Sequence, residues 1–217
     1  MPTILGPSSP FPDPNQADAQ GLVAVGGDLS PARLMSAYRS GLFPWSVNPV
    51  TWWSPDPRGI FELHNFHVPR SLARVIERGT FSVTRNQAFA EVIKQCAAPG
   101  PGRQGTWLTP EFMAAYTQLH HLGNAHSVEC WQAGSLVGGI YGVAAGGLFA
   151  GESMFHRVSN ASKVALAHLI HHLRESGFVL FDIQMVTPAT KPLGAVEISR
   201  HEYLKRLSQA LALNCTF

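Results

Sequence analysis

The chain has 217 residues, of which 45% are hydrophobic and 14% charged, so it is long enough to bury a core of its own. Its 16 Lys and Arg residues against 14 Asp and Glu leave a formal charge of +2, which excludes a strongly basic nucleic-acid-binding protein. Any contact with nucleic acid must therefore come from a local patch. The three cysteines follow no metal or disulfide spacing and favour a reducing compartment, the cytoplasm.

Residues 1–60 are rich in Pro, Gly and Asp, and one helix is predicted among them. Ser30 suits the N-cap of this helix, Pro31 its first position, and Gly41 its end. Residues 42–59 hold three tryptophans and four prolines, a combination that fits neither a helix nor the middle of a sheet. We therefore expect a small, loop-rich N-terminal domain over residues 1–60 and a larger domain over 61–217.

The larger domain shows a regular alternation of helical and strand patterns. Helices are predicted over 69–79, 86–96, 109–123 and 160–175, with a last helix opened by the Ser199–Glu202 capping box, and strands near 81–84, 127–132, 136–143, 148–152 and 178–186. Residues 130–151 carry no charge, but their glycines indicate turns between short strands, so no membrane span is expected. The element order predicts an α+β fold with a mixed, mostly antiparallel sheet and flanking helices.

The strand at 178–186 carries polar side chains in an apolar run. Asp182 and Gln184 point the same way if the side chains alternate, and burying them is costly unless they are hydrogen-bonded or face a pocket. A strand-helix-strand crossover should place this strand parallel to, and beside, the strand that ends near Glu152. Gly151 would allow close approach to the backbone there. The sequence thus predicts that Glu152 and Asp182 converge at one cleft, where carboxylates can orient an amine or move a proton. The alternative is that each acid only satisfies nearby backbone.

Basic residues gather just after the tryptophans. Arg70, Arg74 and Arg78 recur at four-residue spacing on one predicted helix, and Arg58 and Arg85 lie nearby in sequence. A solvated helix face is one interpretation of this stripe. The other is contact with a phosphate backbone, because arginines beside aromatic rings bind unpaired nucleotides.

Patterns for metal sites and for serine hydrolases are missing from the sequence. The histidine pairs have no Glu or Cys companions at zinc-site spacing, and no G-x-S-x-G segment occurs. We therefore expect no metal and no cofactor.

Several segments, in this order, closely resemble the bacterial leucyl/phenylalanyl-tRNA–protein transferases over nearly the whole chain: GLVAVGGDLSPARL, GLFPW, WWSPDPRG, GTWLTPEF, HSVECW, LVGGIYGV, GESMF, NASKVAL and FDIQ. The resemblance implies a small N-terminal domain and an acetyltransferase-like, GNAT-type catalytic domain. It implies transfer of Leu or Phe from Leu-tRNA or Phe-tRNA to acceptor proteins with N-terminal Arg or Lys, which marks those proteins for degradation by the N-end rule.

The resemblance also assigns residues. Asp182 and Gln184 of FDIQ would form the catalytic centre, supported by Glu152 of GESMF. Trp45 and Trp107 would hold the terminal adenosine of the tRNA. The pocket for the Leu or Phe side chain would be formed by Ile140, Met154 and Leu166, next to Gly151.

Two other functions remain open on the sequence. An acyl-CoA-dependent N-acetyltransferase would have the same fold, but the segment RVSNAS at 157–162 lacks the glycines of a pyrophosphate-binding loop. A non-catalytic RNA-binding module would explain the arginines and tryptophans, but not the convergence of Glu152, Asp182 and Gln184.

Overall fold

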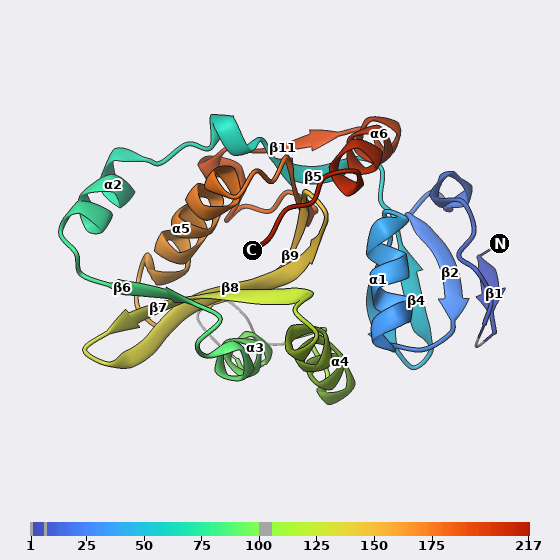
Figure 1. Cartoon of the computed structure of the whole chain (residues 1–217), viewed down its shortest axis with the longest axis horizontal. Coiled ribbons are helices and arrows are strands. Elements are labelled where there is room, and N and C mark those ends of the chain that lie inside the picture. The colour runs from blue at the N-terminus through green and yellow to red at the C-terminus, as the bar shows by residue number, and fades with distance from the viewer. Residues whose placement is uncertain (1, 7, 100–105) are drawn as a thin grey trace.

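The computed structural model describes residues 2–6, 8–99 and 106–217, which form two β-sheets and the helices around them (Figure 1). The smaller sheet has the order β1 (Thr3–Leu5), β2 (Leu22–Gly26), β4 (Val50–Trp53), β3 (Phe43–Val47). The larger sheet has the order β11 (Ala195–Ile198), β5 (Arg58–Phe61), β10 (Leu180–Gln184), β9 (Leu148–His156), β8 (Ser135–Ala145), β7 (Ala125–Gln132), β6 (Ser82–Arg85). This mixed sheet with flanking helices confirms the predicted α+β fold.

The α-helices are α1 (Pro31–Arg39), α2 (Arg70–Glu77), α3 (Phe89–Ala97), α4 (Pro110–His121), α5 (Ala161–Glu175) and α6 (Arg200–Leu211). Two of them begin at the predicted caps: the Ser30 hydroxyl accepts from the Arg33 backbone N–H, and the Ser199 hydroxyl from that of Glu202. Across the described residues, none of the helices combines the length and the apolar character that a membrane span requires.

The tryptophan-rich segment forms a β-hairpin, which corrects the expectation that it avoids a sheet interior. β4 lies between β2 and β3, and its Trp52 is fully buried, with its indole N–H donating to the Gly26 carbonyl. Pro44 is tolerated because β3 is at the edge of the sheet, where a missing N–H breaks no ladder. The prediction failed because it treated the prolines as interrupting every strand, whereas they lie on an edge strand and in the connections.

The predicted parallel pairing of the two site strands is confirmed. β10 runs parallel to β9, with Leu180 opposite Leu148 and Asp182 opposite Ala150. The ladder ends at that last pair, while β9 continues to His156. The two strands therefore part just beyond Asp182, beside Gly151 and Glu152.

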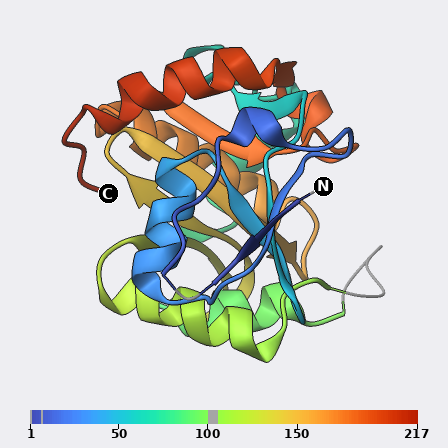
Figure 2. The same ribbon diagram turned by 90° about the vertical axis from the view of Figure 1, so that its right-hand side faces the viewer.

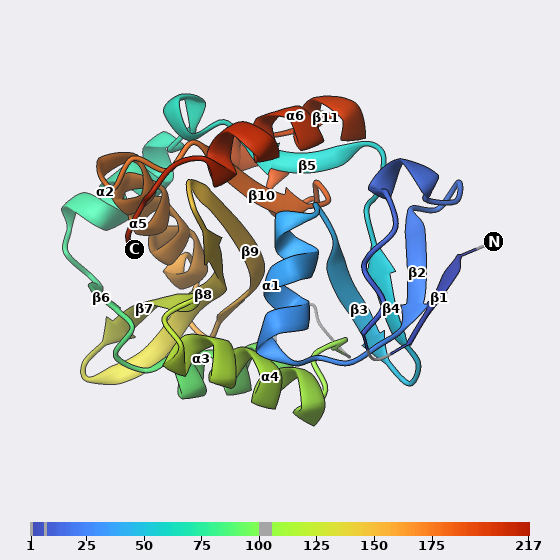
Figure 3. The ribbon, with the colours of Figure 1, turned by 45° about the vertical axis from the view of Figure 1, so that its right-hand side comes forward.

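The helices cover opposite faces of the larger sheet. α5 packs on the face that carries Ile140 and Phe181, whereas α3 and α4 pack on the face that carries Tyr141 (Figure 1). α1 lies between the two sheets and contacts β3, β8 and α4 (Figures 2 and 3). Tyr38 of α1 belongs to the same buried cluster as residues of α3 and α4, so one core joins the sheets. The boundary between the two domains at residues 60 and 61 stays a proposal, and strand β5 crosses this boundary.

Candidate active site

Two pockets meet where β9 and β10 part. The aromatic pocket, of about 240 Å³, is lined by Phe43, Pro44, Trp45, Trp107, Glu152, Ile183, Gln184, Met185 and Thr187. The apolar pocket, of about 150 Å³, is lined by Phe61, Ile140, Gly151, Glu152, Ser153, Met154, Leu166, Phe181, Ile183, Gln184, Met185, Thr187 and Thr190. Glu152 and Gln184 are polar residues of both linings. They therefore lie where molecules bound in the two pockets would touch.

The Asp182 carboxylate lies beneath this junction in a buried ion pair. Its two oxygens accept from Nε and Nη2 of Arg58, at 2.8 and 2.6 Å. The Tyr203 hydroxyl and the backbone N–H of Gln184 also donate to it, at 3.0 and 2.9 Å. Burial alone would lower the pKa of the Arg58 guanidinium, but the adjacent Asp182 carboxylate raises it above its ordinary value. Asp182 has four donors in place and lines neither pocket, so its contact with the pockets is indirect, through the backbone N–H of Gln184.

Gln184 has an unusual backbone conformation that depends on a neighbouring strand. Its φ is +58°, in the left-handed region, and the register between β10 and β5 shifts between Asp182 and Gln184. Gly59 of β5 makes room for this bulge, because a Cβ there would lie 2.6 Å from the Met185 carbonyl carbon. Simple strand alternation therefore ends before Gln184. The bulge directs the Gln184 amide to Glu152, and Nε2 donates to Oε1 at 3.3 Å.

The Glu152 carboxylate is the titratable group that faces both pockets. Its Oε2 accepts from the Tyr116 hydroxyl at 2.9 Å. Burial, the largest influence, raises the pKa of Glu152 to about 7, and the nearby Asp182 carboxylate also raises it. The Tyr38 and Tyr116 hydroxyls and the charge of Arg58 act in the opposite direction and lower this pKa. Glu152 can thus exchange a proton near neutral pH.

The other predicted pocket residues fall into two groups. Trp45, 39% exposed, and Trp107 line the aromatic pocket. Ile140, Met154, Leu166 and Gly151 line the apolar pocket.

The arginines predicted as one basic patch separate in the structure. Arg70, Arg74 and Arg78 are exposed on and just after α2, which lies at the end of the molecule opposite the smaller sheet (Figures 1 and 3). Arg58 does not belong with them, because it is 1% exposed and bound to Asp182. A contact with phosphate therefore remains a prediction for the α2 arginines, and Arg58 is removed from that patch.

Three other contacts of the site were missed by sequence reasoning. Tyr38, Tyr116 and Tyr203 all contact the carboxylates through their hydroxyls or through one another. Each of them lies on a helix, and a core tyrosine whose hydroxyl needs a partner was the available signal. Among the described residues, no group of three or more His, Cys, Asp or Glu side chains could hold a metal ion.

Comparison with known proteins identifies the family. The model of the leucyl/phenylalanyl-tRNA protein transferases matches residues 60–208, and the model of their N-terminal domain matches 27–56. The chain belongs to this family. A leucyl/phenylalanyl-tRNA–protein transferase of Nitratidesulfovibrio vulgaris is 53% identical over 203 residues, covering 92% of this chain and 87% of its own. One of Alkalilimnicola ehrlichii is 52% identical over 212 residues, covering 95% and 82%. This transferase therefore moves an amino acid from aminoacyl-tRNA to protein.

Solved structures similar in shape include a GCN5-related N-acetyltransferase from Kribbella flavida. It is 12% identical, with a TM-score of 0.43, over 76% of this chain and 59% of that one.

Proposed function

We propose that this transferase takes leucine or phenylalanine from Leu-tRNA or Phe-tRNA and joins it to proteins that begin with Arg or Lys. The observation that carries the proposal is the pair Glu152 and Gln184, which lines an aromatic pocket and an apolar pocket at once. A reaction between a nucleotide-linked amino acid and an amine needs such a polar junction. The product would be a protein marked for N-end rule degradation in the cytoplasm.

Each pocket suits one part of the aminoacyl-tRNA. Trp45 and Trp107 offer ring faces on which the terminal adenine can stack. Ile140, Met154 and Leu166 surround a space of about 150 Å³ whose lining is mostly apolar, which suits a Leu or Phe side chain. The ester that links the two parts would then cross the gap between β9 and β10, next to Gln184. The exposed Arg70, Arg74 and Arg78 would contact phosphates farther along the tRNA.

The reaction needs little from the protein beyond positioning and proton transfer, because the ester is already activated. The acceptor's α-amine attacks the ester carbonyl carbon, a C–N bond forms, and the bond from that carbon to the ribose oxygen breaks. One proton moves overall from the amine nitrogen to the leaving ribose oxygen. Glu152 is placed to take that proton, and Gln184 to orient the amine and the carbonyl. Asp182 would act by holding the backbone of Gln184.

The acceptor preference follows from charge. The junction carries the Glu152 carboxyl, and an ionised carboxylate there would attract an amino terminus and the basic side chain beside it.

A mixture of Leu-tRNA and a peptide beginning with Arg tests the proposal. Mass spectrometry should show a peptide heavier by one leucine, and Gln184→Ala should slow this product by about 100-fold or more if positioning is lost. Gln209→Ala, on the exposed side of α6, is the matched control and should retain the wild-type rate. An unmodified peptide with the wild-type protein would refute the proposal, and calorimetric binding of CoA would favour an acetyltransferase.

A further inference from the structure

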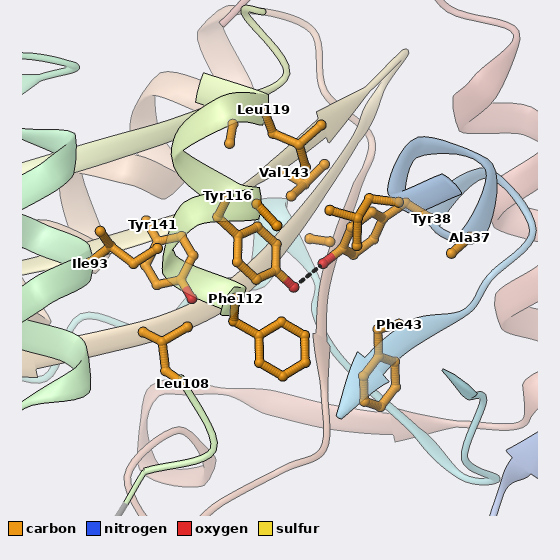
Figure 4. Close-up of a cluster of buried hydrophobic side chains, with 14 of the residues drawn as sticks. Ala37, Tyr38, Phe43, Ile93, Leu108, Phe112, Tyr116, Leu119, Tyr141 and Val143 are labelled. Carbon is orange, nitrogen blue, oxygen red and sulfur yellow. Dashed lines mark hydrogen bonds between the residues drawn. The ribbon is translucent and has the colours of Figure 1, made fainter. Parts of the chain in front are cut away.

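A chain of four hydrogen-bonded side chains links the N-terminal helix to the junction of the pockets. The Tyr38 hydroxyl of α1 lies 2.7 Å from the Tyr116 hydroxyl of α4 (Figure 4). Tyr116 donates to Glu152 at 2.9 Å, and Gln184 donates to the other oxygen of that carboxylate at 3.3 Å. Tyr38 and Tyr116 are buried, with exposures of 1% and 0%. The chain thus runs through protein rather than through solvent.

The core around these tyrosines has no packing need for their hydroxyls. A buried hydroxyl is costly unless it is bonded, and a phenylalanine would fill nearly the same volume. Tyr141, which packs against Tyr116 with ring centroids 5.5 Å apart, shows the contrast. Its buried hydroxyl has no hydrogen-bond partner among the described residues and points toward Leu108 rather than toward Tyr38 (Figure 4). The paired hydroxyls of Tyr38 and Tyr116 are therefore directed at Glu152 in a way that the third one is not.

We propose that Tyr38 and Tyr116 are positioning residues, whose paired hydroxyls orient the Glu152 carboxylate and adjust its readiness to take the acceptor's proton. This rests on the proposed function of Glu152. It assigns the N-terminal helix a part in catalysis, because the outer member of the pair comes from α1.

The electrostatic surroundings of Glu152 fix the direction in which the tyrosine pair shifts the pKa of this carboxyl. The charged or titratable groups that face it are Tyr38 of α1, Tyr116 of α4, Tyr141 of β8, Asp182 of β10 and Arg58 of β5. Burial raises the pKa of both Tyr38 and Tyr116 well above the ordinary value, so their hydroxyls stay protonated at neutral pH. A hydroxyl that donates to a carboxylate stabilises its ionised form. Loss of the pair must then raise the pKa of Glu152.

The test compares Tyr38→Phe and Tyr116→Phe with Tyr141→Phe, three removals of one buried hydroxyl each. The readouts are the pH profile of single-turnover leucine transfer and the ¹³C titration of the Glu152 carboxyl in the free protein. Tyr116→Phe should move the acidic limb of the profile and the carboxyl titration upward by about one pH unit. Tyr38→Phe should move both in the same direction, because the Tyr38 hydroxyl also lowers the pKa of Glu152, and Tyr141→Phe should move neither.

Two results would overturn the proposal: profiles of Tyr38→Phe and Tyr116→Phe that overlay the wild type, or a Tyr141→Phe shift as large as theirs. Thermal melts identify any variant that fails to fold, and the member of the tyrosine pair that still folds then carries the comparison with Tyr141→Phe. The carboxyl titration needs no substrate. It therefore tests the tyrosine pair even if the wild-type protein transfers nothing to an Arg peptide, which would count against the proposed function alone.

Discussion

Replacing Arg58 by methionine should strongly destabilise the fold, because it leaves the Asp182 carboxylate buried without its partner. Both side chains of this ion pair are 1% exposed, and Nη2 lies 2.6 Å from Oδ2. Removing one member of such a pair costs about 3–5 kcal/mol of unfolding free energy. For a chain of this size that lowers the melting temperature by about 6–20 °C. Circular dichroism during a thermal scan measures the shift directly.

Arg206→Met is the matched control, because Arg206 and Glu62 are also 2.6 Å apart but are 33% and 37% exposed. An exposed pair contributes only about 0–1 kcal/mol, so this variant should melt close to the wild type. The double variant Arg58→Met with Asp182→Leu should regain part of the lost unfolding free energy, because no charge is left buried without a partner. Equal melting temperatures for Arg58→Met and Arg206→Met would refute the reasoning that burial, rather than distance, sets the cost.

Three further predictions concern pH, the backbone and the apolar pocket. Burial lowers the pKa of His126 to about 4, so only the unfolded chain is protonated between pH 6.5 and 4, and stability falls as the pH drops through that window. In urea unfolding, His126→Gln should lose about 3 kcal/mol less unfolding free energy than the wild type over this pH window, and a pH dependence equal to that of the wild type would contradict the prediction. Gly59→Ala should displace the Gln184 bulge and slow transfer in the mass assay; a wild-type rate would show that the bulge is dispensable. Met154→Ala should enlarge the apolar pocket and shift competition between Leu-tRNA and Phe-tRNA toward phenylalanine by roughly 10-fold, whereas a constant product ratio would remove Met154 from that pocket.

Local signals in the sequence were sufficient for the helices and for the central strands. Ser30 with Pro31, and Ser199 with Glu202, place the starts of α1 and α6 because capping is decided within a few residues. The pairing of β10 with β9 followed from chain handedness, which needs only the order of elements. These features were predictable because nothing distant in the chain overrides them.

The strands of the N-terminal region were not predicted, for a physical reason. β1 has three residues and β4 has four, so neither shows a measurable alternation of polar and apolar side chains. Pro44 then argued against β3, although an edge strand accepts it. The stability of these strands comes from the core shared with α1 and α4, which is a tertiary contribution.

The composition of the candidate site could be predicted better than its geometry. Gln184 and Glu152 follow from unexpected polar residues in apolar strands. The bulge at Gln184 does not, because it depends on Gly59 of another strand. The partner of Asp182 was equally hidden: Arg58 lies 124 positions away and resembled a surface arginine in sequence. Long-range contacts of this kind decide which carboxylate is held in an ion pair and which one faces the pockets.

Where β9 and β10 part, the larger sheet has an opening between its two faces. The apolar pocket on the α5 side and the aromatic pocket on the other side meet just beyond the last residue pair of the two strands, Asp182 and Ala150. A substitution at Trp107 or at Met154, each of which lines one pocket alone, need not disturb the other pocket, whereas Glu152 and Gln184 line both. On the proposed function, residues that line one pocket alone would let selection of the amino acid and binding of the nucleotide change separately.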